Sequence, residues 1–248
     1  MFTDLTAIQW LTICCSAFFI GMSKTGIQGI TAMTVPYMAM AFGAKESTGY
    51  ILPMLCFADI VAVSYFRKAA DWKAVIRLLP AAVMGFFLAI WIDMQIPASR
   101  FRLLLGLTLL LVFVVMLWNE LAGKENKWAH TWWYSVFFGL LGGFVTMIGN
   151  AAGPVMAVYL LSMRKEKMEF IGTNAWFFLV VNLLKVPLQI FVWHNITWNI
   201  FCLDLLMLPM LGLGAFLGIR IVKRFSDKTF NYFIHVITAS SVIMMLAK

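Results

Sequence analysis

Charged residues are scarce in this sequence. Only 12% of its 248 positions are Asp, Glu, Lys or Arg, whereas 62% are hydrophobic. Because about a quarter of the residues in a soluble domain are charged, this composition excludes a soluble enzyme, and its high hydrophobicity excludes a disordered chain. The 22 Phe and 10 Trp residues suit a bilayer core and its interfaces. The composition therefore predicts a polytopic α-helical membrane protein.

The sequence also lacks motifs for catalysis or metal binding. Its four cysteines lie in apolar segments without metal-ligand or redox spacing, and its three histidines are far apart. Without a phosphate-binding loop an ATP-driven pump is excluded, and we expect no enzyme activity, metal or cofactor. The net charge of +8 comes from short basic clusters between apolar stretches, which is typical of cytoplasmic loops and not of nucleic-acid binding.

Apolar segments of about 20 residues, the length that crosses a bilayer, recur along the chain. Residues 47–66, 74–93, 170–193 and 198–219 have this length, and 101–118 and 230–247 are slightly shorter. Two other apolar regions, 5–42 and 131–163, are interrupted by glycine-rich breaks. The second region is too short for two crossings and a turn, so we expect its pieces to be half-helices of a re-entrant hairpin.

The order of one broken segment followed by three whole segments occurs twice. A shift of 129 positions places 79–117 on 208–246, and a shift of 123 places Gly26 on Gly149 and Asp59 on Asn182. This predicts a first repeat over 1–118, a linker over 119–130 and a second repeat over 131–248. The predicted fold class is an all-α bundle of two repeats, each with one re-entrant helical hairpin and three spanning helices.

The basic residues predict how the chain is oriented. If both broken regions enter and leave on one side, 13 Lys and Arg residues lie inside and 4 outside, as the positive-inside rule requires. If each broken region crosses once, most of them lie outside. The first arrangement makes the two repeats inverted and puts both termini in the periplasm of a bacterial inner-membrane protein.

The two breaks predict a binding site. A glycine-rich interruption frees backbone N–H groups and starts a new half-helix, whose positive end favours an anion. Matching interruptions in two halves indicate a transporter site, although small residues can also serve close helix packing. The expected substrate-binding residues are Lys24, Thr25, Gly26, Gln28, Gly29, Gly149, Asn150, Gly153 and Lys185.

Two lysines, Lys24 and Lys185, lie within apolar segments, whereas the other Lys and Arg residues lie in loops or at the C-terminus. Lys24 either contacts a bound anion or reaches water from a shallow turn. Lys185 either belongs to the site or forms a structural ion pair with Asp59 or Asp204.

Asp59 and Asp204 are the carboxylates most clearly inside apolar segments. Burial disfavours the charged form, so either residue can carry a coupling proton. Asp59 is the stronger candidate because its counterpart in the second repeat is the uncharged Asn182. We assign Asp59, Asn182 and Asp204 to charge tuning or coupling.

The motifs resemble those of one transporter family. They are Gly26-Ile27-Gln28-Gly29 with Pro36 downstream, Gly149-Asn150-Ala151-Ala152-Gly153-Pro154, and Tyr65-Phe66-Arg67-Lys68 followed by Asp71-Trp72. With them the chain resembles the TauE/SafE sulfite-exporter family over nearly its whole length. The resemblance implies export of a small sulfur oxyanion or organosulfonate across the bacterial inner membrane.

The predicted function is secondary transport of a small anion bound between the two repeats, with the bilayer and a coupling proton as further partners. One alternative is a cation or neutral-solute carrier that uses Asp59 and Asp204. Another is a membrane scaffold protein that transports nothing. Ligand-dependent stabilisation separates the transporters from the scaffold.

Overall fold

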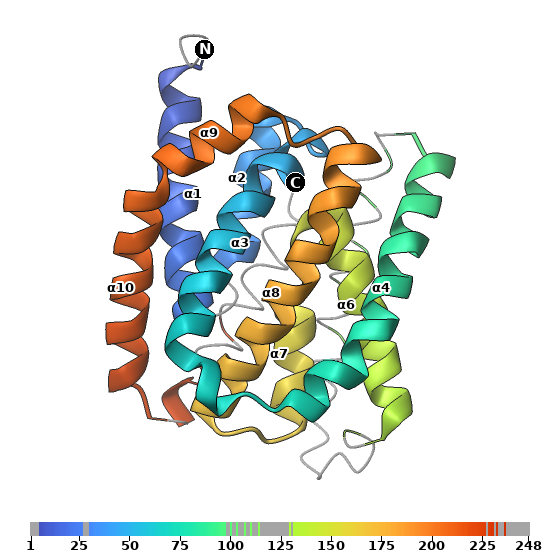
Figure 1. The fold of residues 1–248 in the computed structure, drawn as a ribbon, viewed down its shortest axis with the longest axis vertical. Helices are drawn as coiled ribbons and strands as arrows, with labels where there is room; N and C mark the ends of the chain where they lie inside the picture. The colour runs from blue at the N-terminus through green and yellow to red at the C-terminus, as the bar shows by residue number, and fades with distance from the viewer. Residues whose placement is uncertain are drawn as a thin grey trace.

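The computed structural model describes residues 5–26, 30–97 and 131–226, with a few positions between 100 and 129 and between 228 and 236. These residues form helices and short connections, which confirms the all-helical prediction (Figure 1). The expected segments 101–118 and 230–247 and the linker 119–130 lie largely outside the described residues. The helices are α1 (Ala7–Thr25), α2 (Ile30–Phe42), α3 (Glu46–Phe66), the 3₁₀ turn η1 (Arg67–Ala69), α4 (Trp72–Gln95), α6 (Trp132–Gly149), α7 (Gly153–Ser162), α8 (Lys167–Phe191), α9 (Trp198–Leu206) and α10 (Leu208–Arg224).

Several of these helices are long and apolar enough to cross a membrane. Among the described residues, α1, α3 with η1, α4, α6 and α8 pass this test, and α9 with α10 make a sixth span if they count as one bent helix. Large apolar side chains cover the outside of the bundle, including Ile8, Met94 and Phe191, each more than 70% exposed. Such a surface is stable against lipid and not against water.

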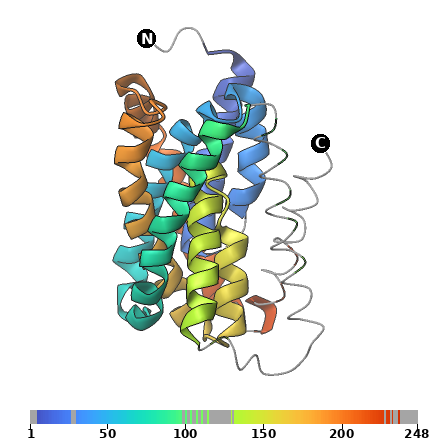
Figure 2. The same ribbon diagram turned by 90° about the vertical axis from the view of Figure 1, so that its right-hand side faces the viewer.

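Each glycine-rich break joins two helices into a hairpin. In the first hairpin, Gln9 near the start of α1 donates to the Ala41 carbonyl near the end of α2, 3.0 Å away. In the second, the hydroxyls of Ser135 and Tyr159 lie 2.9 Å apart and join the start of α6 to α7. Figure 2 shows α6 and α7 side by side. The second hairpin fits the expected half-helices only in α7, because α6 has 18 residues and is as long as a span.

Three helix pairs organise the bundle. Helix α3 packs along α8 in the middle, α1 packs along α10 on one side, and α4 packs along α6 on the other (Figure 1). The connections at 43–45 and 192–197 and the end of α4 lie at one end of the bundle, which we call the outer end. The connection around η1, the α7–α8 connection and the end of α10 lie at the opposite end, the inner end.

The segment expected as one spanning helix over 198–219 is bent. Helices α9 and α10 meet at Met207 with an angle of 50°. Pro209 stands in the first turn of α10. Its ring lacks an N–H group and clashes with the carbonyl four residues earlier, so the helix ladder ends there.

Candidate functional site

A buried ion pair lies at the centre of the bundle. The Nζ atom of Lys24, in the last turn of α1, is 2.9 Å from Oδ1 of Asp59 on α3. The same ammonium group lies 3.8 Å from the ring centroid of Phe178 on α8, a cation–π contact. Asp59 is fully buried and Lys24 is 7% exposed. The counter-charge of Lys24 is therefore a carboxylate of the protein itself.

Asn182 extends this pair across the α3–α8 contact. Its Nδ2 atom donates to the second carboxylate oxygen of Asp59 at 2.6 Å, and its Oδ1 atom accepts from Lys185 at 3.2 Å. The two residues that the sequence repeat places at equivalent positions, Asp59 and Asn182, thus contact each other directly. Asp59 has a partner on each oxygen.

Lys185 is held by neutral oxygens. Its Nζ atom donates to the carbonyl and the hydroxyl of Thr146, both at 2.9 Å, and to Oδ1 of Asn150 at 2.6 Å. With Asn182 this makes four acceptors around one nitrogen, enough for an ammonium group with three protons. Lys185 is fully buried and forms no ion pair with Asp59 or Asp204, so the alternative of a structural ion pair is not found among the described residues.

The second break shapes the cage around Lys185. Helix α6 ends at Gly149, and Asn150 adopts a left-handed conformation with φ 54°, which asparagine tolerates better than most residues. The Thr146 carbonyl, in the last turn of α6 at the negative end of the helix, accepts from the backbone N–H of Asn150 at 3.0 Å and from Lys185 as a second donor. The ammonium group of Lys185 satisfies this helix end, while Nδ2 of Asn150 donates to the Thr48 carbonyl at 3.1 Å.

Other expected site residues have different surroundings. The Thr25 hydroxyl contacts the carbonyls of Gly21 and Ala215 and ties α1 to α10. Gly26 also faces α10, because an added Cβ would collide with the Gly218 carbonyl. Gly149 and Gly153 flank the Asn150 turn as the last residue of α6 and the first of α7. Gln28 and Gly29 lie outside the described residues.

Asp204 lies apart from this cluster. It is 1% exposed on α9, and neither carboxylate oxygen has a hydrogen-bond partner among the described residues. The two carboxylates that the sequence analysis grouped together thus differ in their surroundings.

A polar chain that sequence reasoning did not identify continues to the outer end. The Thr48 hydroxyl lies 3.3 Å from Oε1 of Gln189 and 3.2 Å from Nδ2 of Asn195. Nδ2 of Asn195 also donates to the Lys45 carbonyl at 3.0 Å. The signal in the sequence was a glutamine within the apolar run of α8, which is costly unless paired.

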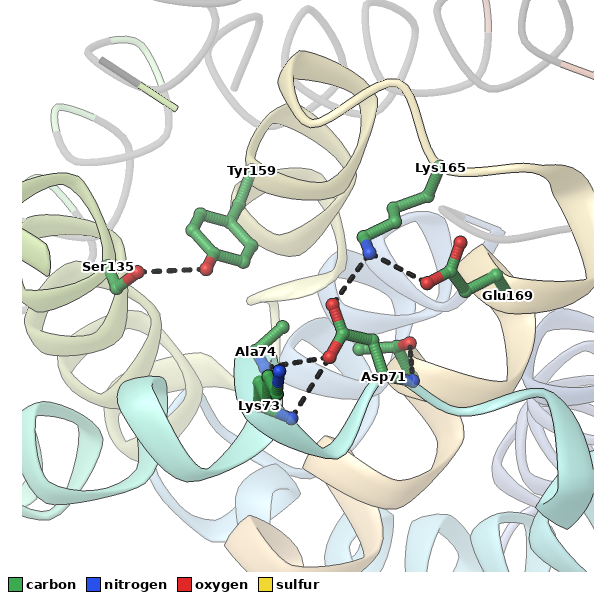
Figure 3. A network of polar contacts seen from close by, with 8 residues as sticks. Asp71, Lys73, Ala74, Ser135, Tyr159, Lys165 and Glu169 are labelled. Atoms are coloured by element: carbon green, nitrogen blue, oxygen red, sulfur yellow. Dashed lines mark hydrogen bonds and ion pairs between the residues drawn. The ribbon is translucent and has the colours of Figure 1, made fainter. Parts of the chain in front are cut away.

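A charged cluster closes the inner end. Nζ of Lys165, in the α7–α8 connection, lies 2.6 Å from Asp71 and 2.7 Å from Glu169. Asp71 also caps α4 by accepting from the backbone N–H groups of Lys73 and Ala74 (Figure 3). Partial burial opposes the charged form of Asp71, but Lys165 and the two N–H groups outweigh it and hold its pKa below the usual range. Burial likewise opposes the charge of Lys165, but its two carboxylate partners raise its pKa.

Together, the buried polar cluster and the apolar exterior fit a protein that handles a polar solute inside a membrane. A sequence profile described as sulfite exporter TauE/SafE matches residues 13–245, nearly the whole chain. Searches of curated proteins and of solved structures gave no match. The chain therefore belongs to the sulfite exporter TauE/SafE family, a family of multi-pass membrane transporters and not of enzymes.

Proposed function

We propose that this protein is a secondary transporter that exports a small anion, sulfite or a small organosulfonate, across the bacterial inner membrane. The family supplies the sulfur oxyanion as substrate class. The observation that carries the proposal is the position of Lys185, whose fully buried amino group contacts neutral oxygens and no carboxylate among the described residues.

The charge count of the buried cluster favours an anion. Lys24 and Asp59 neutralise each other, and Lys185 adds one positive charge when it is protonated. A buried ammonium group is stabilised by an anion and destabilised by a cation, so a singly charged anion that reaches Lys185 favours its protonated form and is bound in preference to a cation or a neutral solute. The same count weighs against a cation site at Asp59, because Lys24 already occupies one side of its carboxylate.

Contact with the anion requires the cage around Lys185 to open. The ammonium group is fully buried, and its protons point to Thr146, Asn150 and Asn182. An anion can replace one or more of these acceptors when the α6–α7 hairpin moves relative to α8. Lys24, whose charge Asp59 neutralises, and the backbone around Gly26, Gly149 and Gly153 are assigned to the path of the anion, and Lys185 to its binding.

We also propose that the two halves are inverted repeats, and equivalent close contacts support this. A Cβ atom added at Gly143 on α6 would collide with the Ala82 carbonyl of α4, and one added at Gly21 on α1 would collide with the Leu211 carbonyl of α10. Gly143 lies 122 positions after Gly21, and Leu211 lies 129 positions after Ala82. These shifts are close to those of the sequence repeat.

A second pair of contacts agrees with the first. Gly172 on α8 faces the Phe66 carbonyl, and Gly49 on α3 faces the Asn195 carbonyl. The shifts are again 123 and 129 positions. These contacts lie at opposite ends of the α3–α8 pair, as an inversion requires. With the basic residues of the inner end in the cytoplasm, both chain termini are periplasmic.

Transport by the purified protein in liposomes tests the proposed function. Wild-type protein is expected to move sulfite or sulfoacetate, and Lys185→Met is expected to reduce this flux to the level of protein-free liposomes. Lys45→Met is the matched control, because Lys45 pairs with Asp93 at the outer end, away from the cluster. Wild-type flux in Lys185→Met would contradict the proposal.

A further inference from the structure

A second buried carboxyl group has no partner among the described residues to stabilise its charge. Asp204 is 1% exposed, and no hydrogen-bond donor among the described residues reaches either of its oxygens. It stands one turn before the bend between α9 and α10, at the C-terminal end of α9. The negative end of a helix disfavours a carboxylate.

The groups that face Asp204 do not relieve this cost. Tyr50, on the adjacent helix α3, is the titratable side chain whose interaction with Asp204 the structure records. No Lys, Arg or His side chain among the described residues forms an ion pair with the Asp204 carboxyl group. The described residues contain no group of three His, Cys, Asp or Glu side chains that could hold a metal ion. A proton is the cation that such a site accepts.

Asp59 is the contrasting case on α3. Its carboxylate has Lys24 on one oxygen and Asn182 on the other, so its charge is stabilised at every stage in which these contacts hold. Asp204 loses nothing by being protonated and must meet water or a donor before it can ionise.

We propose that Asp204, and not Asp59, is the carboxyl group that binds and releases the coupling proton during anion transport. While it is buried, Asp204 carries the proton. When α9 moves and admits water, the O–H bond of the carboxyl group breaks, the proton goes to water and the carboxylate is hydrated. This inference rests on the proposed transport function and adds the coupling ion and its residue.

The position of Asp204 connects the outer end with the anion cluster. Tyr50 beside it and Asp59 in the centre both lie on α3, nine positions apart, or about 14 Å along the helix. Helix α10, which begins at the bend after Asp204, packs along α1, the helix that carries Lys24. A movement of α9 that hydrates Asp204 is thereby transmitted to both sides of the Lys24–Asp59 pair.

Two transport measurements on the same protein test this assignment. In Asp204→Asn, sulfite accumulation driven by a pH gradient is expected to be lost, whereas exchange of labelled for unlabelled sulfite at equal pH continues near the wild-type rate. Asp204→Glu restores a titrating group and is expected to restore accumulation. Asp93→Asn, at a carboxylate paired with Lys45 at the outer end, is the matched control and keeps both activities.

The outcomes separate the two proposals. If wild-type protein shows neither exchange nor accumulation, transport of sulfite is wrong and the proton assignment falls with it. If wild-type and Asp204→Asn proteins accumulate sulfite equally, transport stands and the assignment to Asp204 is overturned.

Infrared spectroscopy of the wild-type protein tests the protonation directly and does not depend on how well Asp204→Asn folds. We expect the C=O stretching band of a protonated carboxylic acid at neutral pH, displaced in Asp204→Glu. Absence of this band would overturn the assignment.

Discussion

The two sides of the α3–α8 pair share their backbone packing and differ in the charges they bring to the centre. Helix α1 meets α10 through close glycine contacts that have equivalents between α6 and α4. Yet α1 contributes Lys24, which pairs with the carboxylate of Asp59, whereas α6 contributes the carbonyl and hydroxyl of Thr146, which surround Lys185. One side is electrically balanced, and the other holds a buried lysine without a carboxylate partner among the described residues.

This difference distinguishes the residues that pack the helices from the residues that bind a charged solute. If the two halves are repeats, as we propose, their shared backbone needs only small residues where helices touch, and glycine contacts of this kind occur in both halves. A site for a charged solute needs a charge that the protein has not already neutralised. Lys185 meets this requirement and Lys24 does not, although both are lysines buried in apolar segments.

The largest effect on stability is expected when the ion pair between Lys24 and Asp59 is broken. Asp59→Asn leaves Lys24 buried without a counter-charge, which typically costs about 3–5 kcal/mol of folding free energy. The double variant Lys24→Met with Asp59→Leu removes both charges and should be close to wild type or more stable. Thermal unfolding in detergent measures both. Equal stability of Asp59→Asn and wild type would show that the ion pair contributes nothing to the fold.

A smaller effect on stability is expected from substitutions in the glycine contacts of the α1–α10 and α4–α6 pairs. Gly214→Ala on α10 and Gly85→Ala on α4 each push a methyl group into a backbone carbonyl of the facing helix, at Phe18 and Leu140. We expect each to cost about 1–3 kcal/mol, with similar values because the contacts are equivalent. Gly212→Ala is the control on α10, since nothing lies within 4 Å of its added Cβ. A loss at only one of the two sites argues against equivalent halves.

The smallest effect is expected at the inner end, where the charges are partly exposed. Asp71→Asn keeps a good helix cap and removes the charge facing Lys165, at a cost of about 1 kcal/mol. Because the pKa of Asp71 is lowered by folding from 3.8, its charge stabilises the protein above that pH. This contribution is lost as the pH falls through the lower, folded value.

The pH dependence of this difference can be measured by thermal unfolding. Lys165 has its pKa raised from 10.5, so its contribution is complete below that pH and is lost as the pH rises through the higher, folded value. The stability difference between wild type and Asp71→Asn should therefore be constant from about pH 5 to about pH 9 and shrink in acid. A difference that grows in acid would contradict this interpretation.

Much of the central cluster could be predicted from the sequence. Lys24, Asp59, Asn182, Lys185 and Asn150 were all expected at the site, because a polar side chain within an apolar segment is costly and must meet others. Their pairing could not be predicted. The pairing depends on how far the α1–α2 hairpin enters the bundle and on the rotation of α3 against α8. The spacing of residues in the sequence predicts neither.

The bend at Met207 is a second feature that could not be predicted from the sequence. The repeat places Pro80 and Pro209 at equivalent positions, but α4 continues through Pro80 whereas α9 and α10 separate just before Pro209. A proline weakens the helix ladder in both places. The proline alone therefore does not determine whether the helix bends, and the residues around it in the sequence do not predict the outcome.

Binding of sulfite and sulfoacetate to a matched set of variants tests the central claim most directly. Titration calorimetry should show binding to wild-type protein and to the double variant Lys24→Met with Asp59→Leu, which keeps the net positive charge of the cluster. Lys185→Met should bind neither anion, although its fold is retained in thermal unfolding. If Lys185→Met binds both anions with wild-type affinity and the double variant does not, the charge that attracts the substrate is Lys24, and the assignment of that role to Lys185 is wrong.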